Sequence, residues 1–75
     1  MYRITHTTQR AMGNAFLLTF PAMGKQIVLA DGGEMQLMKA LRAKALKPIS
    51  HKRISNIDAD CLQSVGVKTY IIEEE

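Results

Sequence analysis

The spacing of apolar residues changes at Asp31-Gly32-Gly33, and this change constrains the fold more than any other feature. Before it, apolar and polar residues alternate in short runs, which is typical of half-buried β-strands. After it, apolar residues recur every three or four positions, which is the spacing of an amphipathic helix. The sequence therefore predicts a sheet in the first part of the chain and helices in the next.

Three strands are predicted before the change, over residues 2–8, 15–20 and 25–30, where β-branched and aromatic residues alternate with polar ones. Pro21-Ala22-Met23-Gly24 fits a hairpin connection, because proline fixes φ early in the turn and glycine permits a positive φ late in it. Residues 9–14 form a turn. Short connections favour pairing between neighbours, so an antiparallel three-stranded meander is expected.

The first helix is predicted from Glu34 to Lys47 and ends before Pro48, which cannot continue a helix. Its broad apolar arc contains Leu37 and Leu41, and its lysines lie on the opposite side.

Residues 50–65 permit two interpretations. Apolar residues at helical spacing allow a single helix from Ser50 to Val65, whereas the capping signals favour a basic connector over residues 47–54 and a short helix over residues 56–65. Ser55 and Asp58 resemble a capping box, and Gly66 suits the position just after a helix end. We therefore expect the connector and the short helix.

A last strand over residues 67–72 completes the predicted order β-β-β-α-α-β, and Glu73-Glu74-Glu75 is expected to be a frayed tail. The whole chain of 75 residues is predicted to be one α+β domain, with two helices on one face of a mainly antiparallel sheet. A domain of this size buries only roughly 60% of the surface of its unfolded chain. A homodimer through an edge strand, or through Met12, Met23 and Phe20, therefore stays open.

Cysteine usage and hydropathy indicate the compartment. The lone Cys61 excludes an internal disulfide and a cysteine metal cluster, which fits a reducing cytoplasm, and it is expected to be a small buried apolar residue. No apolar run approaches the ~20 residues that span a bilayer. The sequence predicts a soluble cytoplasmic protein with no membrane partner.

Catalytic and metal-binding patterns are scarce. His6 and His51 have no second ligand at helical spacing, and Asp58 and Asp60 suit a helix start better than acid–base work. Residues 30–33 lack the glycine pattern and the lysine of a phosphate-binding loop. We therefore predict no enzyme activity, no cofactor and no metal.

The strongest functional signal is a window without acids. No carboxylate occurs between Glu34 and Asp58, yet six of the ten basic side chains lie there. Such a surface attracts phosphate or acidic protein through its summed field, although a merely solvated helix face is the ordinary alternative. The candidate binding residues are Lys39, Arg42, Lys44, Lys47, Lys52 and Arg53.

The sequence also limits how nucleic acid could be bound. The sequence argues against a helix-turn-helix, because the two predicted helices are separated by about eight residues that include Pro48 and no glycine. Only Tyr2 and Tyr70 could serve as aromatics for recognition of RNA on a sheet. Contacts with the nucleic-acid backbone, with little sequence preference, are the expected mode.

Two functions fit these observations. The first is a non-enzymatic regulatory protein that docks through the basic helix and connector onto nucleic acid or a nucleoprotein complex. The second is an inhibitor or adaptor of the phage or mobile-element type, which binds a host protein by protein–protein contacts, for example at a sheet edge. The two overlap if the target is a nucleic-acid-processing complex.

Overall fold

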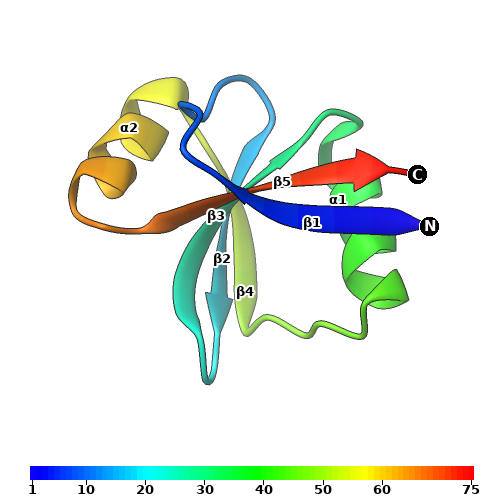
Figure 1. The fold of residues 1–75 in the computed structure, drawn as a ribbon. Coiled ribbons are helices and arrows are strands. Elements are labelled where there is room, and N and C mark those ends of the chain that lie inside the picture. The colour runs from blue at the N-terminus through cyan, green and yellow to red at the C-terminus, as the bar shows by residue number, and fades with distance from the viewer.

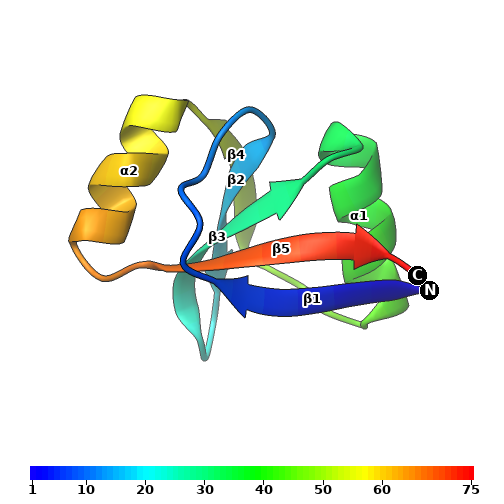
Figure 2. The same cartoon turned by 45° about the horizontal axis from the view of Figure 1, so that its top comes forward.

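The computed structural model describes all 75 residues, which form a five-stranded mixed sheet with one helix on each face (Figure 1). The strand order β1-β5-β3-β2-β4 leaves β1 and β4 at the two edges. The two termini lie beside each other at one end of the molecule (Figure 2). The elements are β1 (Tyr2–Thr7), β2 (Ala15–Phe20), β3 (Gly24–Ala30), α1 (Gly33–Ala43), β4 (Ser50–Ile54), α2 (Asn56–Ser64) and β5 (Lys68–Glu74).

The predicted hairpin between β2 and β3 is confirmed, and Gly24 has the positive φ, 73°, that its turn requires. The predicted meander of three strands is wrong, because β1 does not pair with β2. Instead β1 pairs antiparallel with β5, and β5 pairs parallel with β3. The connection over residues 8–14 is long enough to carry the chain from β1 across β5 and β3 to β2, so strands that are consecutive in sequence need not pair.

The predicted order of elements lacks one strand. Residues 50–54, expected in a basic connector, form β4, which pairs antiparallel with β2. The observed order is β-β-β-α-β-α-β. The single helix over residues 50–65 is therefore excluded, and the short second helix is confirmed at Asn56–Ser64.

The two helices cover opposite faces of the sheet, which corrects the prediction that both lie on one face. Leu37 and Leu41 of α1 pack on the face that carries Phe16 and Val28, whereas Ala59 of α2 packs on the face that carries Ile27. The strands β3, β4 and β5 are parallel to one another, so α1 and α2 are both crossover connections. Right-handed crossovers that run in opposite directions along a sheet place their helices on opposite faces.

Each helix ends in a Schellman motif. In α2, Gly66 has a φ of 91°, as its sequence position predicts. In α1 the corresponding residue is Ala45, with a φ of 55°. The N–H of Leu46 donates to the carbonyl oxygen of Leu41 (2.9 Å), and the N–H of Ala45 donates to that of Arg42 (3.2 Å). This motif ends α1 at Ala43, four residues before the predicted end.

The start of α2 follows the sequence prediction. The hydroxyl of Ser55 accepts a hydrogen bond from the N–H of Asp58 at 3.2 Å, which satisfies one of the free amides of the first turn. By contrast, Cys61 is exposed on the outer side of α2 and not buried as expected. Two large apolar residues of the same side, Ile57 and Val65, are exposed as well.

The C-terminal glutamates are ordered and not frayed. β5 continues to Glu74, and the N–H of Glu75 donates to the carbonyl oxygen of Met1 at 2.8 Å. Glu73 forms an ion pair with Arg3 across β1 and β5. Its hydrogen bond and charge raise the pKa of Arg3 above the usual value.

Candidate functional site

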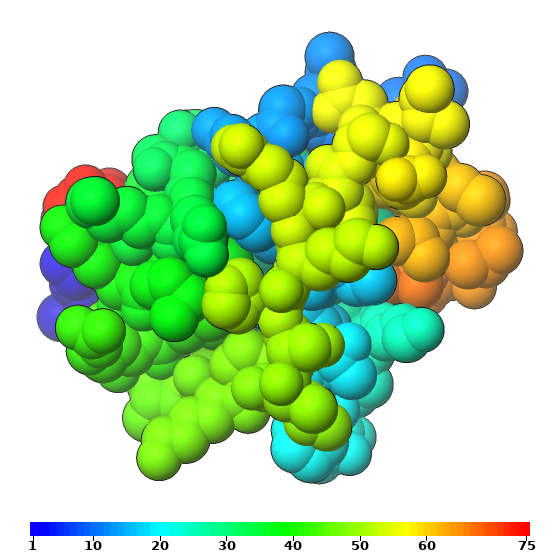
Figure 3. Space-filling view, turned by 180° about the vertical axis from the view of Figure 1, so that it is seen from behind, coloured from blue at the N-terminus to red at the C-terminus, as the bar shows by residue number.

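A groove runs between α1 and the edge strand β4. The most extensive contacts of α1 with the strands are with β3 and β1, whereas β4 lies at the edge of the sheet opposite to β1. Two adjoining cavities of about 420 and about 180 Å³ form the groove, and His51 lines both. Figure 3 shows the hollow between α1, in green, and the ridge of β4, in yellow-green. We call this feature the basic groove. Its cationic lining is Arg42, Lys47 and Arg53, and His51 lies where the two cavities meet.

The floor of the basic groove is apolar. Met38 remains 39% exposed, while Leu41 is buried and Leu46 is half-buried. Phe16 of β2 lies under the smaller cavity. The groove therefore combines an apolar base with charged groups on its sides, an arrangement that suits a ligand with both apolar and anionic parts.

Three of the six predicted binding residues line the basic groove, namely Arg42, Lys47 and Arg53. None of the six forms an ion pair with a carboxylate. The structure contains one ion pair between permanently charged groups, Arg3–Glu73, and one contact between His51 and Glu34, and neither involves a predicted residue. The cations of the groove are therefore exposed and not neutralised by direct partners.

The other three predicted residues lie outside the basic groove. Lys39 is on the exposed side of α1, and Lys44 is the exposed C-cap of that helix. Lys52 pairs with Leu17, whose side chain belongs to the cluster under α2. Because side chains alternate along a strand, Lys52 projects from the face opposite to His51 and Arg53. The six candidate binding residues, predicted to form one surface, are thus divided over three surfaces.

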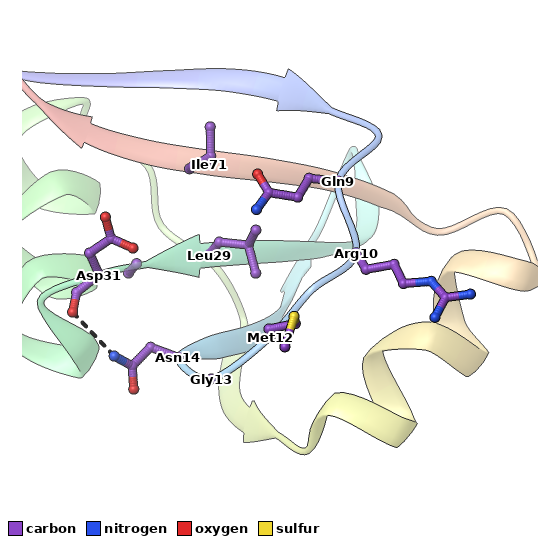
Figure 4. Close-up of a pocket in the computed structure, with 9 residues that line it drawn as sticks. Gln9, Arg10, Met12, Gly13, Asn14, Leu29, Asp31 and Ile71 are labelled. Atoms are coloured by element: carbon purple, nitrogen blue, oxygen red, sulfur yellow. Dashed lines mark hydrogen bonds between the residues drawn. The ribbon is translucent and has the colours of Figure 1, made fainter.

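Arg53 is the most firmly positioned cation. Its guanidinium carbon lies 5.7 Å from the centroid of the Phe16 ring, a cation–π arrangement. One of its nitrogens donates to the side-chain oxygen of Asn14. The amide nitrogen of Asn14 in turn donates to the carbonyl oxygen of Asp31 at 3.2 Å, the bond drawn in Figure 4. These contacts leave the other N–H groups of Arg53 free for an anion.

Glu34 is the one acid of the basic groove, and its carboxylate lies 3.1 Å from Nε2 of His51. The side chains are 67% and 34% exposed, so the pair is solvated and contributes little to stability. It connects the first turn of α1 to β4 across the smaller cavity. Sequence reasoning missed Asn14, Phe16 and Glu34, since their roles depend on β4 being a strand.

A separate cavity of about 270 Å³ lies beside the end of β3. Figure 4 shows Leu29 and Ile71 beneath the loop that carries Gln9 and Met12. In the neighbouring turn over residues 30–33, the N–H of Gly32 donates to Oε1 of Gln36 at 2.9 Å, so this amide is not free to bind phosphate. The interpretation of this segment as a plain turn is consistent with that bond.

No three His, Cys, Asp or Glu side chains lie close enough together to hold a metal ion. Neither helix combines the length and the apolar character that crossing a bilayer requires. No known protein family, curated protein or solved structure matches the chain.

Proposed function

We propose that this protein is a non-enzymatic binding protein that docks its basic groove and β4 onto the sugar–phosphate backbone of nucleic acid, either free or within a nucleoprotein complex. The observation that carries the proposal is the convergence of Arg42, Lys47 and Arg53 on one groove without a carboxylate partner. Such cations bind phosphates and release the counterions that surround them. The cytoplasm, which the single Cys61 favours, is the proposed compartment.

The expected mode is backbone contact with little sequence preference. Base stacking on a sheet needs exposed aromatic side chains. Here a helix packs on each face of the sheet, and Tyr2 and Tyr70 are half-buried against the core under α1. Arg42 is the one groove side chain on α1 that could reach a base edge, so the phosphates supply most of the binding energy.

A protein partner is the second candidate, and the open edge of β4 favours it. An extended acidic segment could add to β4 through backbone hydrogen bonds and place its carboxylates near Arg53 and Lys47. This is the binding mode expected of an inhibitor or adaptor. Purification from a nuclease-treated lysate separates the two candidates, because only a protein partner would be retained.

The test is a binding titration with a labelled single-stranded oligonucleotide at several salt concentrations. Replacing Arg42, Lys47 and Arg53 together by glutamate should weaken binding roughly tenfold or more, because phosphate contacts are lost and counterions are no longer released. Each lost contact should also reduce the slope of log affinity against log salt by about 0.7.

The matched control replaces Arg10, Lys25 and Lys68 by glutamate, which changes the net charge equally but leaves the basic groove intact. This control should keep the salt slope of the original protein. Equal weakening by both triple variants would show that net charge alone, and not the groove, attracts the nucleic acid.

A further inference from the structure

The edge strand β1 lacks the features that usually keep sheet edges apart. It pairs with β5 in unbroken register over its six residues and contains no proline, lysine or bulge. Its one permanent charge, Arg3, is paired with Glu73. The other edge differs, because β4 carries Lys52 and Arg53 and would oppose cations to cations in a symmetric pair.

The hydrogen bond from Glu75 to Met1 shows which backbone groups of β1 are free. It marks Met1 and Glu75 as a hydrogen-bonded pair of the antiparallel ladder. Such pairs alternate along two antiparallel strands, so Arg3, Thr5 and Thr7 also direct their N–H and C=O groups to β5. The groups of the even residues, Tyr2, Ile4 and His6, therefore point out of the sheet.

The charges near β1 favour contact between two copies. Arg3 and Lys68 balance Glu73 and Glu74 along β1 and β5, although the chain as a whole carries a formal charge of +3. The basic groove, with its unpaired cations, lies beside β4, which forms the opposite edge of the sheet from β1. Two positively charged molecules can therefore meet through β1 with little repulsion.

We propose that β1 pairs antiparallel with β1 of a second copy around a two-fold axis at Ile4. This register places Ile4 opposite Ile4 and Tyr2 opposite His6, and all of these residues have outward backbone groups. Arg3 faces Thr5, so no like charges are opposed. The two five-stranded sheets become one continuous sheet with β4 and a basic groove at each end. This inference does not rest on the proposed function.

The structure gives less support to the other surface considered for dimerisation. Met12 and Met23 are 68% and 53% exposed, but Phe20 is only 6% exposed and belongs to the core under α1. Phe20 is therefore not free to join a surface with them. The alternative cannot use the three residues together, whereas β1 offers a continuous row of unpaired backbone groups.

Light scattering over a wide concentration range tests the dimer, in a Cys61→Ser background that prevents disulfide cross-links. The mass should rise to twice that of the chain. Ile4→Pro removes an amide that points outward and leaves the bonds to β5 in place, so this variant should stay monomeric. Ile4→Val keeps the amide and should still dimerise. A monomer at every concentration, or a dimer of Ile4→Pro, would overturn the proposal.

Amide hydrogen exchange of the unsubstituted protein provides a measurement that does not depend on the folding of a variant. The amides of Tyr2, Ile4 and His6 should be protected in concentrated solution and lose that protection on dilution. Those of Arg3 and Thr5 should be protected in both, because β5 binds them. A doubled mass without protection of the even amides would place the interface elsewhere and overturn the proposal.

Discussion

Ala45 is the one non-glycine residue of this chain with a positive φ, and it completes the Schellman motif that ends α1. Gly66 fills the same position after α2 and adopts its φ of 91° without a steric penalty. An L-residue in the left-handed region costs about 1–2 kcal/mol, because its Cβ approaches the following carbonyl oxygen. The two helix ends thus share one backbone geometry, but only the end of α1 carries the steric cost of a positive φ at a non-glycine residue.

The substitution Ala45→Gly should raise the free energy of unfolding by about 1 kcal/mol, because it removes this strain and keeps the hydrogen bonds. Urea denaturation measures the change. The control Ala43→Gly lies in the last helical position and should lower the same quantity by up to about 1 kcal/mol. Lower stability of Ala45→Gly would mean that the strain of Ala45 is negligible.

The exposure of Cys61 shows the limit of prediction at single residues. Ile57, Cys61 and Val65 have the helical spacing of a buried stripe, yet they face solvent. The buried side of α2 is instead marked by the small Ala59, with Leu62 packed beside it. Spacing identified the helix but could not decide which of two apolar stripes meets the sheet, because that choice depends on strands far away in the sequence.

Among the elements, those with a local signal were predicted and β4 was not. The β2–β3 hairpin and α2 carry turn and capping residues that act over a few positions. The sequence of β4, Ser-His-Lys-Arg-Ile, has one buried residue, Ile54, and no apolar alternation. Its extended conformation comes from backbone pairing with β2, and only the tertiary structure supplies that partner.

The start of α2 provides a test at the level of one element. Ser55→Ala should lower the free energy of unfolding by about 1 kcal/mol, because the amide of Asp58 loses its hydrogen-bond acceptor. Ser55→Asp retains an acceptor and a favourable charge at the helix start, so it should remain near the original stability. Chemical denaturation compares the three proteins. Equal stability of all three would show that the Ser55 cap contributes nothing.

For the molecule as a whole, the placement of the helices follows from connectivity more than from composition. The chain crosses from β3 to β4 through α1 and returns to β5 through α2. This reversal places the helices on opposite faces. Without β4, the two helices would follow each other directly in the chain and would be expected in one layer on the same face. The absence of β4 from the prediction therefore explains why both helices were expected on one face of the sheet. It also explains part of the error in the predicted strand order.

The candidate site was predicted in part for the same reason. The stretch without acids between Glu34 and Asp58 identified the six basic residues. How these residues are divided among surfaces depends on where α1 ends and on the alternation of side chains along β4. Arg42, Lys47 and Arg53 share the basic groove, whereas Lys52 projects from the other face. The formal charge of +3 is thus unevenly distributed, with the acidic end of β5 next to the edge strand β1 and the basic groove beside the other edge strand, β4.

We propose above all that the basic groove binds phosphate. Mapping amide chemical shifts during titration with a single-stranded oligonucleotide at low salt tests it most directly. We expect the largest changes at Arg42, Lys47, His51 and Arg53, and we expect them to shrink as salt is added. Changes centred on β1, β5 or α2, or changes that persist unaltered at high salt, would contradict it.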